Sequence, residues 1–180
     1  VVSSPYWANG DKAYAGAATW GGATGITGVV SVENSLVGTH AYDFLGSYGV
    51  EVLRDADNTY TNYIIKSGQW NQSAGAVTWV DGNTGHAHGD SSSGAVVSAA
   101  NSLVGTTQNG GYTGMYATAL RLNNVGTGDV VISSDYWQDC GLVGAVTFMP
   151  GATGLAGQIS WRNSLLNLQG TASSNIGWGY

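Results

Sequence analysis

Three tryptophans recur at one position of a repeated phrase and are the sharpest candidates for chemistry in this sequence. Each one ends an apolar run, VVSSPYW at Trp7, IIKSGQW at Trp70 and VVISSDYW at Trp137. An indole has a flat apolar body and a polar N–H, so at the end of a strand it can stack on the apolar face of a sugar ring. Side chains able to bind sugar hydroxyls follow each tryptophan: Asn9, Asp11, Asn71, Gln72, Gln138 and Asp139.

These nine residues form the predicted ligand-binding set, and repetition of one weak site would add multivalent strength. The alternative is that each indole wedges between adjacent units as a structural residue, and the sequence leaves both interpretations open. Trp20, Trp79 and Phe148 replace one another within a strand and are expected in the core. Three further recurring residues are expected to hydrogen-bond the backbone of their own turns: Asn34, Asn101 and Asn163.

Catalytic groups are hard to assemble from the remaining residues. There is no GxSxG nucleophile elbow and no phosphate-binding loop, and nothing near Cys140 suggests a general base. His86 and His88, with Asp90, have i, i+2 spacing that could hold a metal, but they occur in one unit only, which favours a solvated loop. We therefore expect a non-enzymatic protein.

Composition narrows the class of partner. Five Lys and Arg residues against a formal charge of −6 leave almost nothing to neutralise phosphates, which excludes nucleic acid as a partner. No apolar run approaches the roughly 20 residues that a bilayer requires, so no membrane insertion is expected. Few charged residues, a single cysteine and abundant glycine are typical of bacterial secreted or surface proteins.

The positions of these residues follow from an internal repeat. AGAATW, AGAVTW and VGAVTF end at Trp20, Trp79 and Phe148, and each is followed by an NSL phrase, so the chain is a threefold repeat of roughly 60–65 residues. The units span approximately 1–48, 49–115 and 116–180. Short alternating apolar runs with no 3.6-residue period predict an all-β fold.

The central unit contains four predicted strands, in GVEVL, TNYIIKS, AGAVTW and SGAVVSA, whereas Leu36–Val37 is expected to be an apolar plug. Four antiparallel strands per repeat match a β-propeller blade, and three repeats also match a β-trefoil or a β-prism. The chain starts at the second strand of a unit and ends with IGWGY at Tyr180, where a first strand would begin. The first and last units are therefore expected to share one interrupted unit.

The phrases DVVISS, AGAVTW and NSLVGTT together resemble FG-GAP repeats of integrin-type β-propellers. The chain resembles more closely the tandem Gly/Asn-rich repeats of bacterial surface proteins, over essentially its whole length. The resemblance implies extracellular recognition, adhesion or scaffolding. FG-GAP loops often bind calcium, and here only Asp55 and Asp57 remain as carboxylates for such a site, with a plain hairpin turn as the alternative.

Three blades are too few for a closed propeller, which needs at least four. The chain is thus expected to associate, to form part of a longer array, or to close as a trefoil or prism. Two functions remain open: a recognition module that binds a glycan or another cell-surface ligand, and a structural subunit that assembles with itself.

Overall fold

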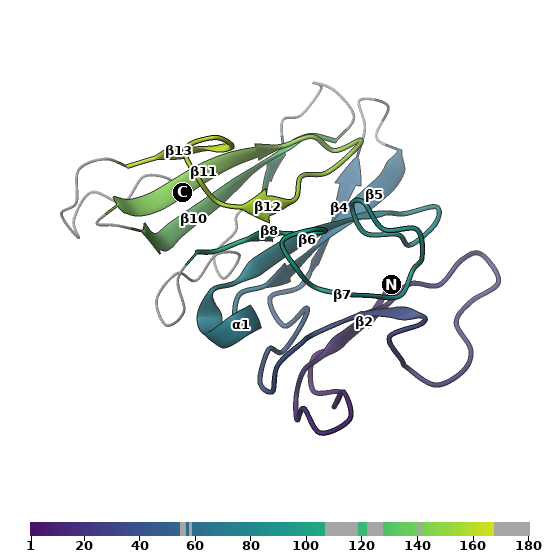
Figure 1. The fold of residues 1–180 in the computed structure, drawn as a ribbon. Coiled ribbons are helices and arrows are strands. Elements are labelled where there is room, and N and C mark those ends of the chain that lie inside the picture. The colour runs from purple at the N-terminus through teal and green to yellow at the C-terminus, as the bar shows by residue number, and fades with distance from the viewer. Residues whose placement is uncertain (55–56, 58, 107–118, 122–127, 140–141, 168–180) are drawn as a thin grey trace.

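The computed structural model describes residues 1–180 except 55–56, 58, 107–118, 122–127, 140–141 and 168–180. It consists of three β-sheets that lie one above another (Figure 1), joined by long turns. The one helix among the described residues is the four-residue turn α1 (Trp70–Ser73). The all-β prediction is confirmed.

The first sheet has the order β1-β2-β3-β7. Its three antiparallel strands come from the first unit: β1 (Val2–Ser4), β2 (Ala17–Thr19) and β3 (Ser35–Val37). The fourth, β7 (Ala95–Val96), comes from the second unit and pairs with β3 in parallel.

The second and third sheets repeat this plan. The second contains β4 (Val50–Arg54), β5 (Tyr60–Ser67), β6 (Ala76–Asp81) and β8 (Leu103–Val104), and receives β12 (Gly157–Gln158) in parallel from the third unit. The third contains β9 (Ala119–Arg121), β10 (Val130–Asp139), β11 (Leu142–Met149) and β13 (Ser164–Leu166). In the described part of the chain, β13 is an edge strand.

The fourth strand of each unit differs from its prediction. It is formed by the NSL phrase, and the SGAVVSA segment instead supplies β7, which pairs with the preceding unit. Leu36–Val37, expected to be a plug, is therefore part of a strand: its side chains are buried while its backbone pairs with β2 on one side and β7 on the other. The prediction of a shared interrupted unit depends on Ile176–Tyr180, which lies outside the described residues.

The middle sheet is buried on both faces by the sheets that neighbour it. Successive side chains of a strand point to opposite sides, so each central strand contributes to both contacts. On β5, Tyr63 and Ile65 pack with Leu36 and Leu45 of the first unit, whereas Ile64 packs with Ile132 of the third unit. The two apolar clusters therefore lie between neighbouring sheets. They join the units face to face in an open series, and no closed barrel or ring is seen in the described residues.

The three recurring asparagines hold their turns as predicted. The Oδ1 atoms of Asn34, Asn101 and Asn163 accept hydrogen bonds of 2.9–3.0 Å from the backbone N–H three residues earlier, and their Nδ2 atoms donate to the carbonyl five residues earlier. The core prediction is confirmed for Trp79, which is buried. It is wrong for Phe148, which is 49% exposed because no further sheet of the described chain covers it.

Candidate functional site

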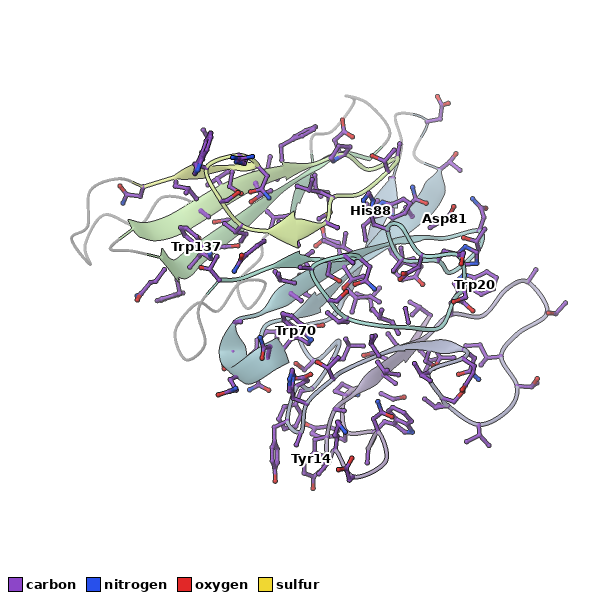
Figure 2. The ribbon with its side chains drawn as sticks, in the orientation of Figure 1. Tyr14, Trp20, Trp70, Asp81, His88 and Trp137 are labelled. Atoms are coloured by element: carbon purple, nitrogen blue, oxygen red, sulfur yellow. The ribbon has the colours of Figure 1, made fainter. Side chains whose placement is uncertain are left out.

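Two of the three corner tryptophans have no exposed face. Trp137 is fully buried and Trp70 is 7% exposed, and each belongs to one of the two apolar clusters between sheets (Figure 2). Their indole N–H groups are buried and have no hydrogen-bond partner among the described residues. Trp7 is half-buried. This geometry favours a structural role for Trp70 and Trp137.

The polar residues that follow Trp7 are engaged locally. Asn9 donates from Nδ2 to the Gly38 carbonyl at 3.4 Å and pairs through its backbone with Lys12. Asp11 is exposed, and Lys12 donates to its carboxylate at 2.9 Å, which lowers the pKa of that carboxyl.

The residues that follow Trp137 lie on β10, in a different unit. Gln138 is exposed, and its carbonyl accepts a hydrogen bond from the Thr106 hydroxyl at 3.2 Å. Asp139 pairs through its backbone with Leu142, and its side chain lies outside the described residues. The predicted ligand-binding set therefore does not converge on one surface.

Four aromatic rings do converge, at the outer edge of the first unit where Tyr14 lies (Figure 2). We call Tyr6, Tyr14, Tyr42 and Phe44 the aromatic platform. The rings of Tyr14 and Phe44 are stacked, with centroids 5.7 Å apart and an interplanar angle of 7°. Tyr6 meets both of them edge-on, at 6.1 and 5.9 Å, and Tyr42 lies 5.6 Å from Tyr14.

The platform is exposed even though its rings touch. Tyr6 is 73% exposed, Tyr42 is 59% exposed and Tyr14 is 44% exposed. Large aromatic side chains gathered on a surface leave apolar area in water, and such patches commonly mark a binding site. The tyrosine hydroxyls add polar groups at the rim of the same patch.

The backbone beneath the platform is strained. Non-glycine residues seldom adopt positive φ, because the Cβ atom then crowds the carbonyl, at a cost of roughly 1–2 kcal/mol each. All six such residues in the described part of the chain lie in the platform or next to it. They are Tyr14, Tyr42, Phe44, Asn71, Gln72 and Ser73. Strain of this kind clusters at functional sites.

The buried carboxylate of Asp43 fixes this conformation. One of its oxygens accepts hydrogen bonds of 2.8 Å from the backbone N–H groups of Thr39 and His40. The other accepts a bond of 2.8 Å from the N–H of Asn71, at the left-handed turn of α1 in the next unit. Because Asp43 stands between Tyr42 and Phe44 in the chain, these bonds position both rings.

A pocket of about 360 Å³ adjoins the platform. Tyr42, Phe44 and Ala41 line one side, and Gln69, Gln72 and Ser73 line the other. An apolar wall facing a few polar side chains is the usual composition of a small-ligand site. Of the predicted ligand-binding set, Gln72 alone lines this pocket.

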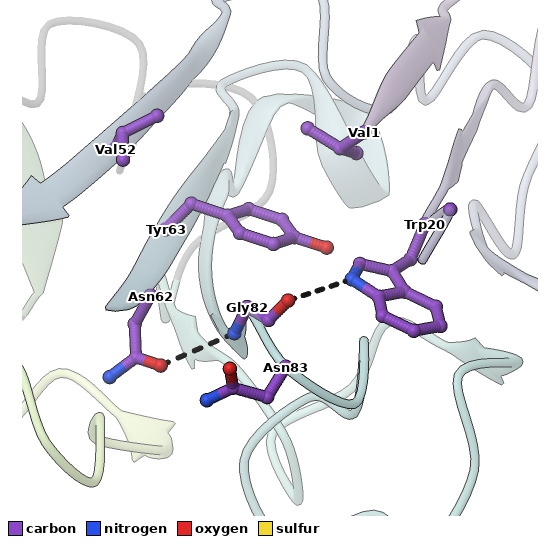
Figure 3. A pocket seen from close by; sticks show the side chains of 8 residues that line it. Val1, Trp20, Val52, Asn62, Tyr63, Gly82 and Asn83 are labelled. Atoms are coloured by element: carbon purple, nitrogen blue, oxygen red, sulfur yellow. Dashed lines mark hydrogen bonds between the residues drawn. The ribbon is translucent and has the colours of Figure 1, made fainter. Parts of the chain in front are cut away.

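A second, smaller pocket of about 240 Å³ lies at the junction of the first two units (Figure 3). Both backbone polar groups of Gly82 are hydrogen-bonded there: Trp20 Nε1 donates to its carbonyl at 3.0 Å, and its N–H donates to Asn62 Oδ1 at 3.2 Å. The Tyr63 ring lies beside Gly82 (Figure 3). Burial raises the pKa of Tyr63, and the charge of Asp81 adds to the effect. Because its donors and acceptors serve the contact between units, we interpret this pocket as structural.

No metal centre is seen among the described residues, where no three His, Cys, Asp or Glu side chains are grouped. Asp57 is exposed in a turn, and Asp55 lies outside the described residues, so the calcium prediction stays untested. His88 instead makes a hydrogen bond of 2.6 Å through Nδ1 with the Thr153 carbonyl. In the same part of the chain, no helix has the length and apolar character to span a bilayer.

The sequence contains one indication of the platform, the aromatic loop around Tyr42 and Phe44, but it lies outside the recurring phrases. Comparison of the three units highlights residues that recur. Tyr6 is one of these, since Tyr136 precedes Trp137 in the same way, but Tyr14, Tyr42 and Phe44 come from loops that differ between units. The loop around Tyr42 and Phe44 is noticeably rich in aromatic residues, but only the fold brings it next to Tyr6 and Tyr14.

Three stacked sheets built from one repeating unit define an all-β repeat protein. The chain belongs to the family described as a repeat of unknown function (DUF5650), which matches residues 1–47, 58–113 and 124–177. No curated protein and no solved structure shows a significant match.

Proposed function

We propose that the chain is a non-enzymatic, extracellular recognition module that binds carbohydrate at the aromatic platform. The observation that carries the proposal is the convergence of four rings, three of them well exposed, on a backbone held in strained conformations. A surface that only had to be soluble would need neither feature.

The chemistry of the platform fits a sugar. The axial and ring C–H groups of a pyranose carry a slight positive charge and meet the negative face of an aromatic ring favourably. The rings of Tyr6 and Tyr42 are the most exposed of the four and are best placed to contact such a face. Gln69, Gln72 and Ser73 across the adjoining pocket offer amide and hydroxyl groups to sugar hydroxyls.

Positive φ at Tyr42 and Phe44, fixed by Asp43, means that the rings are positioned before a ligand arrives. Preorganisation of this kind reduces the ordering cost of binding. The proposal moves the expected glycan site from the corner tryptophans to the platform and leaves Trp70 and Trp137 as core residues.

We also propose that each unit is a blade of the propeller type. Support comes from the face-to-face packing of the sheets through two apolar clusters and from the antiparallel order within each unit. A closed propeller would need further units, from the same chain or another.

A glycan array followed by calorimetric titration of the sugars it identifies tests the carbohydrate proposal. Tyr42→Ala and Tyr6→Ala are each expected to weaken binding about fivefold to twelvefold, since stacking contacts of this size are worth about 1–1.5 kcal/mol. Tyr136→Ala, which removes an exposed tyrosine of the third unit, is the matched control and is expected to bind as the wild type does. Binding that survives both platform substitutions, or no binding to any glycan, would contradict the proposal.

A further inference from the structure

The units are joined by one set of contacts that occurs twice. Trp20 Nε1 donates to the Gly82 carbonyl of the second unit at 3.0 Å, and Trp79 Nε1 donates to the Gly151 carbonyl of the third unit at 2.8 Å. In both cases the indole packs on a glycine three residues further on. A Cβ atom at Gly85 would lie 2.4 Å from Trp20 Cγ, and one at Gly154 would lie 2.5 Å from Trp79 Cγ.

A parallel strand completes each junction. Val97 donates its N–H to the Val37 carbonyl at 3.1 Å, and Ile159 donates to the Val104 carbonyl at 2.9 Å. Both donating residues are 1% exposed. A junction thus consists of an aromatic side chain and a strand edge from one unit, and a glycine turn and a short strand from the next.

The first unit carries the receiving half of this junction, and among the described residues no other unit covers its Gly25. Its turn Gly22–Gly25 has the same GATG sequence as 151–154, and a Cβ atom at Gly25 would meet no atom within 4 Å. Gly28 has φ 106°, close to the 114° of its equivalent Gly157. Asn34 holds the following segment by a hydrogen bond of 2.9 Å to the Val29 carbonyl, as Asn163 holds β12.

This segment is formed but uncovered. Val29 is 84% exposed, and Val30, the equivalent of Val97 and Ile159, is only half-buried. We call Gly22, Gly25 and Gly28–Val30 the receiving end. Around Gly28 and Asn34 it matches the two occupied junctions, and it has no partner among the described residues. Its turn differs from theirs, because Gly25 N–H donates to the Gly22 carbonyl at 3.0 Å, whereas Gly85 and Gly154 donate to the carbonyls of Asp81 and Pro150.

The third unit carries the donating half, which no further unit covers in the described part of the chain. Phe148 stands at the position of Trp20 and Trp79 and is 49% exposed. Leu165 on β13 is 69% exposed, whereas its equivalent Leu103 is fully buried beneath the next unit. We call Phe148, Leu165 and the outer edge of β13 the donating end.

We infer that the donating end of one copy of this chain binds the receiving end of a second copy, by the contacts that already join its own units. Phe148 then lies on Gly25, and the Gly28–Val30 segment adds to β13 as a parallel strand. The occupant is a second copy, because the same interface already forms twice within the chain. One uncovered half of it lies in the first sheet of the stack, and the other half lies in the third.

The interface is heterologous, so each bound copy presents a new free end. Such contacts give rings if the rotation closes and open filaments if it does not. The net charge of −6 on every copy opposes the contact, and salt is expected to strengthen it by screening.

Sedimentation velocity of the whole 180-residue chain over a range of concentrations and salt tests the inference. Species at multiples of 18.5 kDa are expected to appear as concentration rises. Leu165→Asp blocks the donating end and Val30→Asp blocks the receiving end, so each variant alone is expected to be monomeric. Their equimolar mixture is expected to give dimers and nothing larger, since one free end of each kind remains.

Two further variants keep the test informative if a blocked variant fails to fold. Phe148→Trp restores the indole N–H that donates at the other junctions and is expected to tighten association about threefold to tenfold, the value of one hydrogen bond. Val96→Asp places the same charge at an exposed valine of the second unit, which carries neither end, and is expected to associate as the wild type does. A chain that stays monomeric at all concentrations and salts, or a mixture of blocked variants without dimers, would overturn the inference.

Discussion

Thr78 Oγ1 and Ser102 Oγ lie 2.6 Å apart in a buried hydrogen bond that joins the AGAVTW phrase to the NSLVG phrase of the same unit. The equivalent pairs are Thr19 with Ser35 at 2.8 Å and Thr147 with Ser164 at 2.6 Å. Each serine also donates to the asparagine before it. The two phrases recur together because they form one hydrogen-bonded network.

Removing the asparagine of this network is expected to be most costly in the middle unit. Asn101 accepts from Ser98 N and Ser102 Oγ and donates to Val96 O and Asp90 Oδ2, and it is 4% exposed. Asn101→Ala leaves several of these groups buried without partners and is expected to lower the free energy of unfolding by about 3 kcal/mol.

Asn163→Ala is the matched control, because Asn163 makes similar bonds at an exposed end of the stack, where water can replace them. A loss of about 1 kcal/mol is expected there. Urea titration with a shared m-value measures both variants. Equal losses would contradict the account of the network.

The stability of the fold is expected to decline at alkaline pH through Tyr63. Burial raises the pKa of its phenol above the ordinary value of 10.0, so the folded protein keeps the proton after the unfolded chain has lost it. The stabilisation is fully present below pH 10. It is lost as the pH rises from there toward the folded pKa, by up to about 1.4 kcal/mol per pH unit.

Tyr63→Phe removes this titration while it keeps the ring. As the pH rises from 8 to 11, the urea midpoint of the wild type is therefore expected to fall relative to that of the variant. A constant difference across that range would show that Tyr63 titrates normally.

Asp43 is expected to couple the aromatic platform to the stability of the first unit. Asp43→Ala leaves the N–H groups of Thr39, His40 and Asn71 without their acceptor, and bonds to a buried carboxylate are worth about 1.5–3 kcal/mol each before relaxation. We expect a loss of at least 2 kcal/mol in the free energy of unfolding. Binding at the platform is expected to weaken in the same variant.

Asp11→Ala, which removes an exposed carboxylate of the first unit, is expected to leave both quantities unchanged. Chemical denaturation and titration of a sugar that binds the wild type measure the two effects. An Asp43→Ala protein that is destabilised but binds sugar normally would show that Asp43 does not position the rings.

The repeat and the strand class could be predicted from the sequence because both are local. Alternating apolar residues and recurring phrases such as NSLVG state which segments are extended. They do not state which segments pair. The sequence therefore predicts SGAVVSA as a strand of its own unit, although β7 pairs with β3 of the preceding one. Which strands pair between units is determined by the tertiary fold, and a local sequence pattern does not contain that information.

The site was harder to predict for the same reason. A tryptophan that recurs is recognised easily, but recurrence follows from the core as readily as from a ligand, and Trp137 is fully buried. The platform occurs in one unit and brings Tyr6 and Tyr14 next to Tyr42, which lies 28 residues beyond Tyr14 in the chain. Positive φ at non-glycine residues, which marks the site, is invisible in the sequence.

Glycine turns receive an aromatic side chain from the neighbouring unit, and one pair of substitutions tests this contact most directly. Gly154 and Gly25 are equivalent, with φ 69° and 90°, but a Cβ atom overlaps Trp79 at Gly154 and meets open space at Gly25.

Both alanine variants carry the cost of a left-handed residue, about 1–2 kcal/mol. Gly154→Ala is expected to lose a further 1–3 kcal/mol in the free energy of unfolding, because the indole is displaced. Equal losses for Gly154→Ala and Gly25→Ala, measured by urea denaturation, would contradict the claim.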